Sequence, residues 1–219
     1  MTTKAALFDL DGTLIDSKAY HILAWRELFH RHGHLVREED ILRTFGQTSP
    51  HIIQMLFPLE LNSKKVAALA SEKEELFRDL IRDELTLLPG ARELLLALRH
   101  AHYGIALATS APPKNARMVL RVLEIASLFD VTVGERDIAR SKPDPEIFLL
   151  AAKKLGVRPD RCVVFEDSPS GVSAAVAANM SCVAVTTGYG PVELPDANLW
   201  IEDFRAIDVP AIEALMGNH

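Results

Sequence analysis

The sequence predicts an α/β protein whose parallel sheet is interrupted by an inserted all-helical domain. From residue 89 onward, short apolar runs alternate with helical segments, which is typical of βαβ units. An apolar strand is expected at residues 5–9, yet residues 17–85 show a helical pattern without a strand signal. We therefore expect an α/β core formed by residues 1–15 and 89–219, and a helical domain formed by residues 16–88.

The expected elements follow one another in a regular order. In the helical part, helices are expected near residues 17–32, 38–44, 50–57 and 63–84. Pro89 and Gly90 then suit the start of a helix, and the alternation of helices and strands begins there. Further helices are expected at residues 91–102, 113–126, 144–156 and 169–179. Strands are expected at residues 104–109, 130–134, 162–166 and 181–187.

The composition excludes several classes of function. The 219 residues carry a formal net charge of -6, so we expect no basic surface for nucleic acid. No apolar run approaches the length of a membrane span and no basic-then-apolar leader is seen, so a soluble cytoplasmic protein is expected. Cys162 and Cys182 are expected as buried thiols rather than as a disulfide. A monomer is favoured over an oligomer.

Two carboxylates follow the first expected strand. Asp9 and Asp11 stand two residues apart, and their like charges are costly unless a cation or a shared proton relieves them. Gly12 allows a sharp turn after them. A calcium loop is excluded, because Gly is fourth counting from Asp9 and Tyr20 occupies the twelfth position. A hairpin turn or a solvated acidic turn remains an alternative to a metal site.

Polar residues also follow the other expected strands. The carboxyl ends of parallel strands meet at one edge of a sheet, where ligands bind. Each polar set taken alone could instead cap a helix or face solvent. The sets that we expect at this edge are Asp9 and Asp11, Thr109 and Ser110, Glu166 and Asp167, together with Lys142 before the following helix.

These four sets resemble, in order and spacing, the four motifs of the haloacid dehalogenase superfamily. The motifs are Asp9-Leu10-Asp11-Gly12-Thr13, Thr109-Ser110, Lys142-Pro143-Asp144 and Glu166-Asp167-Ser168. The similarity is greatest to the branch that includes β-phosphoglucomutase and phosphoglycolate phosphatase. It implies a Rossmann-like parallel sheet with the first strand central, and a helical cap inserted after the first motif.

The resemblance also implies a mechanism of phosphoryl transfer. Asp9 would attack phosphorus to form an aspartyl-phosphate, and Asp11 would act as general acid and base. An acid at position 11 favours phosphate esters over the halide and phosphonate substrates of the superfamily. Thr109 and Lys142 would stabilise the transferring group. Magnesium is the expected cofactor, with Asp9, Asp11, Glu166 and Asp167 as its expected ligands.

Substrate contacts are expected from both domains. His21, Trp25 and Leu28 form one stripe of the first cap helix, although an interior role for them is equally open. Lys114 could instead be a helix-surface residue. The full expected set for substrate binding is Thr13, Ser110, His21, Trp25, Gln47, Thr48, Lys114 and Asn115.

The leading hypothesis is a magnesium-dependent phosphatase of a small phosphorylated metabolite. A phosphohexomutase is the first alternative, and a non-catalytic metal- or phosphate-binding regulatory protein is the second. A mutase needs a cation to hold the phosphate that is not reacting. No Lys or Arg occurs from Thr44 through Ser63, where mutases of this branch carry an arginine, so a phosphatase is favoured. A dinucleotide-binding enzyme is excluded, because no G-x-G-x-x-G follows the first strand.

Overall fold

The computed structural model describes residues 3–44, 48–58 and 60–217, and its chain divides into two compact units. The core unit comprises Met1–Asp16 and Thr86–His219, and the helical unit comprises Ser17–Leu85. The sequence placed these divisions after residues 15 and 88. In the described part of the chain, no helix has both the length and the apolar character needed to cross a membrane.

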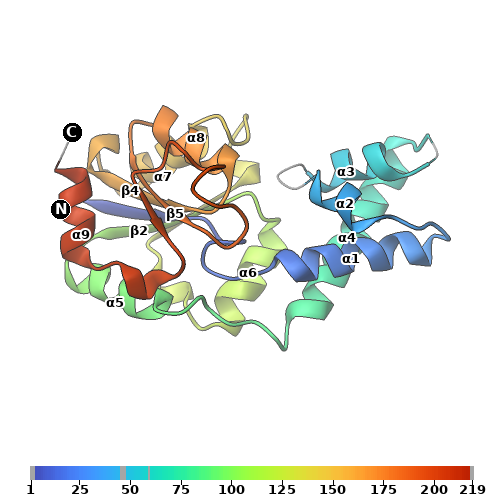
Figure 1. Cartoon of the computed structure of the whole chain (residues 1–219), viewed down its shortest axis with the longest axis horizontal. Coiled ribbons are helices and arrows are strands. Elements are labelled where there is room, and N and C mark those ends of the chain that lie inside the picture. The colour runs from blue at the N-terminus through green and yellow to red at the C-terminus, as the bar shows by residue number, and fades with distance from the viewer. Residues whose placement is uncertain (1–2, 45–47, 59, 218–219) are drawn as a thin grey trace. The chain divides into compact units, whose positions relative to one another are not determined.

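A parallel sheet organises the core unit, as the sequence predicted, and it has six strands rather than the five expected (Figure 1). The strand order is β3-β2-β1-β4-β5-β6, so β1 lies inside the sheet between β2 and β4. The inner strands are largely apolar and buried throughout because helices cover both faces, whereas β3 and β6 are partly exposed edges. The strands are β1 (Ala5–Phe8), β2 (Gly104–Thr109), β3 (Val131–Gly134), β4 (Cys162–Glu166), β5 (Ser181–Val185) and β6 (Leu199–Ile201).

Helices cover the two faces of this sheet in pairs that contact each other. On one face α7 packs beside α8, and on the other α5 packs beside α9 (Figure 1). Phe8 of β1 stacks on Phe165 of β4 with ring centroids 4.5 Å apart, and Phe204 packs against both. The helices are α5 (Ala91–His100), α6 (Pro113–Val122), α7 (Glu146–Leu155), α8 (Pro169–Ala177) and α9 (Val209–Met216).

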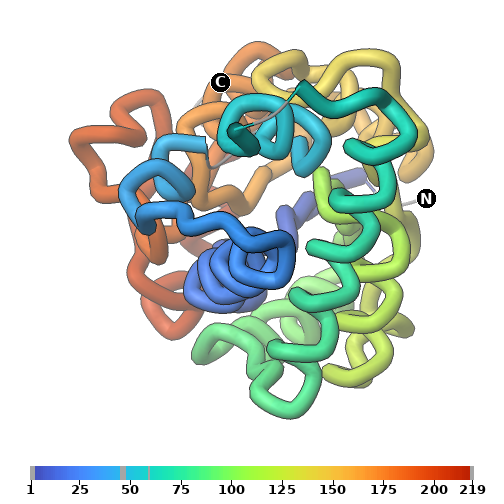
Figure 2. Tube along the Cα trace, turned by 90° about the vertical axis from the view of Figure 1, so that its right-hand side faces the viewer, coloured from blue at the N-terminus to red at the C-terminus, as the bar shows by residue number. Residues whose placement is uncertain are grey.

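The helical unit has its own apolar interior. Its helices are α1 (Lys18–Arg31), α2 (Glu38–Leu42), α3 (Ser49–Leu56) and α4 (Ser63–Ile81). The long α4 contacts both α1 and α3, and Figure 2 shows α1 in blue and α4 in teal from a second direction. Phe29 stacks on Phe57 with ring centroids 4.4 Å apart, and Phe77 is fully buried.

Three predicted helices of the core unit end earlier than expected, for one physical reason. His102, Glu124 and Asn179 have φ values of 61°, 52° and 57°, in the left-handed region that terminates a helix. The following N–H donates to the carbonyl five residues back in each case, as from Tyr103 to Leu98. The predictions also missed β6 and α9, and they extended β5 two residues beyond its end at Val185.

Candidate active site

The carboxyl ends of β1, β2 and β4 bring the predicted site residues together. In β1, Phe8 pairs with Leu107 of β2 and with Phe165 of β4. The next residue, Asp9, donates its N–H to the Phe165 carbonyl at 3.0 Å and stands beside Glu166. The edge of the sheet therefore presents the first motif between the second and the fourth.

Lys142 joins two of these strand ends through its ammonium group. Its Nζ donates to Asp9 Oδ1 at 2.6 Å and to Glu166 Oε1 at 2.5 Å, and lies 3.4 Å from the Ala108 carbonyl oxygen. The Lys142 side chain is only 7% exposed, which excludes the solvated surface lysine that the sequence left open. Burial opposes the charged form, yet Asp9 and Glu166 raise the pKa of Lys142 well above its usual range.

Glu166 uses both of its carboxylate oxygens within the protein. While Oε1 accepts from Lys142, Oε2 accepts from the N–H groups of Asp167 and Ser168 and from the Ser168 hydroxyl, each at 2.9 Å. A Cβ at Gly171 would lie 1.8 Å from Glu166 Cδ, so the start of α8 closes on this carboxylate. These contacts suit a residue that holds Lys142 and the fourth motif in place better than the metal ligand expected from the sequence.

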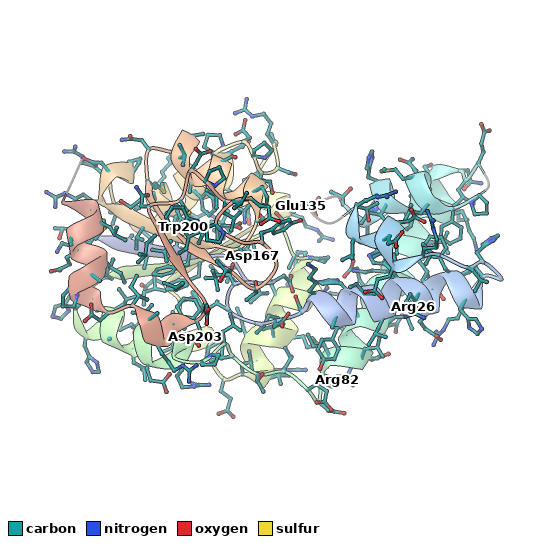
Figure 3. The ribbon with its side chains drawn as sticks, viewed as in Figure 1. Arg26, Arg82, Glu135, Asp167, Trp200 and Asp203 are labelled. Atoms are coloured by element: carbon teal, nitrogen blue, oxygen red, sulfur yellow. The ribbon has the colours of Figure 1, made fainter. Side chains whose placement is uncertain are left out.

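Gly12 makes the turn that carries Asp11 past the end of the sheet. Its φ is +80°, and its N–H donates to the Ile15 carbonyl at 2.8 Å. A Cβ at this position would lie 2.0 Å from Asp167 Oδ2, so only glycine leaves room for that carboxylate. Thr13 Oγ1 lies 3.4 Å from Asp167 Oδ1. The first and fourth motifs are thus in direct contact, and Figure 3 marks Asp167 in the core unit.

At this edge of the sheet, the carboxylate groups outnumber the positively charged groups. Burial is the main cause that raises the pKa of Asp9 to about 7, where Glu166 and Asp11 add to the effect and Lys142 opposes it. Burial also raises the pKa of Asp167 well above its usual range, helped by Glu166 and Asp9. One ammonium group faces four carboxylates, so a further cation would be strongly favoured here.

The donor set fits a hard divalent cation. The carboxylates of Asp9 and Asp167 interact electrostatically with each other and with Asp11, and oxygen donors of this kind suit Mg²⁺. In the described ranges, no group of three His, Cys, Asp or Glu side chains is already arranged as a metal site. The fit therefore rests on the chemistry and charge of the donors.

The predicted residues of the second motif and of α6 differ in their exposure and contacts. Thr109 is buried at the end of β2, and its Oγ1 accepts from the Ala111 N–H at 3.0 Å within the loop. It does not cap the next helix, because α6 begins at Pro113 without a side-chain cap hydrogen bond. Ser110 and Lys114 are exposed in the core unit, whereas Asn115 in α6 is almost completely buried.

Of the predicted stripe on α1, Trp25 and Leu28 lie in the interior of the helical unit, whereas His21 is half-buried. Trp25 is 3% exposed and Leu28 is fully buried. The His21 ring stacks on Phe77 with centroids 3.9 Å apart, and its Nδ1 lies 2.8 Å from Lys73 Nζ. Thr48 is exposed just before α3, and Gln47 lies outside the described residues.

Sequence reasoning missed a buried polar cluster in the helical unit. Lys73 donates to Glu74 Oε1 at 3.0 Å, and the Ser49 hydroxyl donates to the same oxygen at 2.6 Å. The Lys73 ammonium also lies 5.1 Å from the centre of the Trp25 ring. The signal was present, because Lys73 occupies a position on the apolar stripe of α4.

The reasoning also missed Thr187. Its hydroxyl donates to the Gly12 carbonyl at 2.5 Å, so it belongs to the same edge of the sheet. Polar residues after a strand were the signal used at the other strand ends. That signal was hidden here, because β5 was predicted to extend to residue 187 whereas it ends at Val185.

Comparisons with known proteins show the family to which this chain belongs. The sequence profile of haloacid dehalogenase-like hydrolases matches residues 6–185. A validoxylamine A 7'-phosphate phosphatase from Streptomyces hygroscopicus subsp. limoneus is 33% identical over 209 residues, which cover 95% of this chain and 98% of the relative. A β-phosphoglucomutase from Bacillus subtilis (strain 168) is 34% identical over 194 residues, which cover 84% of each chain.

A similar fold is found in a solved structure of a HAD hydrolase, family IA, variant 3, from Entamoeba histolytica HM-1:IMSS. Its TM-score is 0.91 at 29% sequence identity, and the match covers 99% of this chain and 100% of the other. The two chains therefore share their fold over nearly their whole length.

Proposed function

Because the chain belongs to the haloacid dehalogenase-like hydrolases, enzymes that include phosphatases similar to it, we propose that it hydrolyses the phosphate monoester of a small sugar-like metabolite through an aspartyl-phosphate at Asp9. The observation that carries this proposal is the buried ion pair of Lys142 with Asp9 at the carboxyl end of the central strand. It fixes a carboxylate where a phosphate can approach, beside the cation that would balance its charge.

Asp9 is the proposed nucleophile. One of its carboxylate oxygens forms a bond to phosphorus while the bond from phosphorus to the ester oxygen breaks. The hydrogen bond from Lys142 holds the Asp9 carboxylate in one orientation, and the ammonium charge offsets the negative charge of the transferring group. Thr109, next to this pair at the end of β2, would help to position the phosphoryl oxygens.

Asp11 is the proposed general acid and base. The Asp11 side chain is more exposed than that of Asp9. Asp11 follows Asp9 by two residues and directly precedes the turn at Gly12. Its proton goes to the ester oxygen as that oxygen leaves, and Asp11 then takes a proton from the water that attacks the aspartyl-phosphate. Inorganic phosphate is released and Asp9 is regenerated. General acid–base help of this kind is worth about 10²- to 10⁴-fold.

Asp9 and Asp167 would hold the magnesium ion through their carboxylates. Asp11 would do so through its main-chain carbonyl, so that its carboxyl group can carry the proton. When bound, Mg²⁺ would neutralise charge on the phosphate and orient it for in-line transfer. Glu166 would act indirectly, since it holds Lys142 and the Asp167 backbone. We propose that the helical unit acts as the cap that selects the substrate.

The direct test is a turnover screen over phosphorylated sugars, with and without Mg²⁺, that measures release of inorganic phosphate. We expect release from at least one sugar phosphate, loss of release after chelation, and restoration by Mg²⁺. Asp9→Asn is the matched control, because it keeps the shape of the side chain and removes its charge. Release by Asp9→Asn at the wild-type rate would refute the assignment of the nucleophile.

The similarity to a β-phosphoglucomutase makes a mutase the second candidate. It would return the phosphoryl group to a sugar hydroxyl instead of to water. The test is incubation with β-glucose 1-phosphate, Mg²⁺ and a catalytic amount of the 1,6-bisphosphate. We expect phosphate release to exceed isomerisation, because no Lys or Arg occurs from Thr44 through Ser63. Formation of glucose 6-phosphate faster than release of phosphate would establish the mutase instead.

A further inference from the structure

A threonine after the fifth strand reaches the turn of the first motif. Thr187 Oγ1 donates to the Gly12 carbonyl oxygen at 2.5 Å, across 175 residues of sequence. A hydroxyl facing a carbonyl can act only as the donor, so the hydrogen bond has one direction. This contact lies entirely within the core unit.

The segment that carries Thr187 is itself anchored on both sides. Before it, the Thr186 N–H donates to the Ile201 carbonyl of β6 at 2.9 Å. After it, the Gly190 N–H donates to Glu193 Oε2 at 2.8 Å, and Tyr189 packs against the core cluster of apolar residues. Thr187 therefore presents its hydroxyl from a fixed backbone.

The turn that Thr187 holds has little freedom to move without disturbing the site. Gly12 stands in the left-handed region and fits against the Asp167 carboxylate, where a Cβ would lie 2.0 Å from Oδ2. Its N–H is already fixed by the Ile15 carbonyl, and the bond from Thr187 fixes its carbonyl. Rotation of either peptide group at Gly12 would move Asp11 or press against Asp167.

We propose that Thr187 is a positioning residue, whose hydroxyl holds the Gly12 turn so that Asp11 and Asp167 keep the relative placement needed to bind Mg²⁺ and transfer a phosphoryl group. The inference rests on the proposed function for its catalytic consequence. The claim that Thr187 holds the Gly12 turn does not depend on that function, because it rests on the Thr187–Gly12 hydrogen bond alone. Thr187 acts through Gly12 and needs no contact with substrate.

The chain offers matched variants for a test. Thr187→Val keeps the branched shape and removes the donor, whereas Thr187→Ser keeps the donor. Thr186→Val is the control, because the Thr186 hydroxyl also donates to a carbonyl, that of Ile201 at 3.2 Å. The Thr186 N–H donates to the same oxygen, so that carbonyl keeps a partner in the control.

The first readout needs neither metal nor substrate. Amide hydrogen exchange in the peptide that spans residues 10–15 should be about 3- to 10-fold faster in Thr187→Val, a range that corresponds to the loss of one hydrogen bond. It should be unchanged in Thr186→Val and nearly restored in Thr187→Ser. Equal exchange in all four proteins would overturn the inference.

The second readout is Mg²⁺ binding by calorimetry, followed by kcat and KM on the best substrate of the screen. Thr187→Val should bind Mg²⁺ about 3- to 10-fold more weakly and lose kcat by a similar factor, with KM little changed. If Thr187→Val kept the wild-type Mg²⁺ affinity and kcat, the inference would be overturned, but the proposed phosphatase function would still stand. Weaker Mg²⁺ binding in Thr187→Val together with no phosphatase activity in the wild type would support the inference and reject the proposed function.

Discussion

Lys142 holds together two carboxylates that would otherwise repel each other. Its ammonium is within 2.6 Å of Asp9 and 2.5 Å of Glu166, and the Glu166 side chain is 1% exposed. Removing one partner from a buried ion pair leaves an uncompensated charge, which costs about 3–5 kcal/mol. At the scale of single residues, the contact that we propose for catalysis should therefore also stabilise the fold.

We predict that Lys142→Met lowers the free energy of unfolding by several kcal/mol and removes turnover. Lys154→Met is the matched control, because Lys154 pairs with Asp137 at 3.7 Å on the surface, with side chains about two-fifths exposed. An exposed pair contributes about 0–1 kcal/mol. Urea denaturation of both variants measures the difference. Equal stabilities would mean that Lys142 is not holding buried charge.

Gly12 gives a second test at the same scale. We predict that Gly12→Ala abolishes turnover and destabilises the protein more than Gly156→Ala does. Both glycines have positive φ, +80° and +70°, so both variants carry backbone strain of about 1–2 kcal/mol. A Cβ at Gly156 meets nothing within 4 Å, whereas at Gly12 it overlaps Asp167. Thermal unfolding and phosphate release measure the difference. Equal unfolding temperatures and equal rates of phosphate release in the two variants would contradict this prediction.

At the scale of elements, strand positions were predictable and helix ends were not. The expected strands at 104–109 and 162–166 match β2 and β4, because buried apolar runs leave a clear signal. Three helices end two residues before a left-handed residue that is not glycine, namely His102, Glu124 and Asn179. The three residues of β6 form a partly exposed edge, too short for a recognisable alternation.

The pH dependence of α4 is a prediction at this scale. Burial alone would raise the pKa of Glu74, but the charges of Lys73 and His21 and the hydrogen bond from Ser49 lower it below its usual value of 4.5. A carboxyl whose pKa is lower in the folded state stabilises that state above the unfolded pKa, and loses this contribution as pH falls through the folded pKa. Glu74→Gln should therefore be less stable than wild type near pH 7, and this difference should shrink below about pH 4.5.

Trp25 fluorescence in a Trp200→Phe background measures this effect, because Trp25 belongs to the helical unit and Trp200, marked in Figure 3, to the core unit. Glu75→Gln is the control, since Glu75 is exposed one residue further along α4. A stability difference between wild type and Glu74→Gln that stays constant from pH 7 to pH 3.5 would contradict the assigned role.

For the whole molecule, the sequence predicted the class of the fold and the composition of one sheet edge. The proximity of Asp9, Thr109 and Glu166 could be predicted from the sequence, because the carboxyl ends of parallel strands meet at one edge of the sheet. Contacts that depend on side-chain packing could not be predicted in this way. Whether Glu166 faces a metal or Lys142, and whether Trp25 faces a substrate or the interior, depends on rotamers that spacing does not encode.

The central claim is that the phosphoryl group passes through Asp9. The most direct measurement is acid quenching of the enzyme during turnover with Mg²⁺ and the best sugar phosphate, followed by borohydride reduction and peptide mass spectrometry. An aspartyl-phosphate is reduced to homoserine, so we predict homoserine at position 9 in wild type and none in Asp9→Asn. Homoserine at another aspartate, or a phosphorylated residue elsewhere that forms and decays at the rate of turnover, would contradict the account.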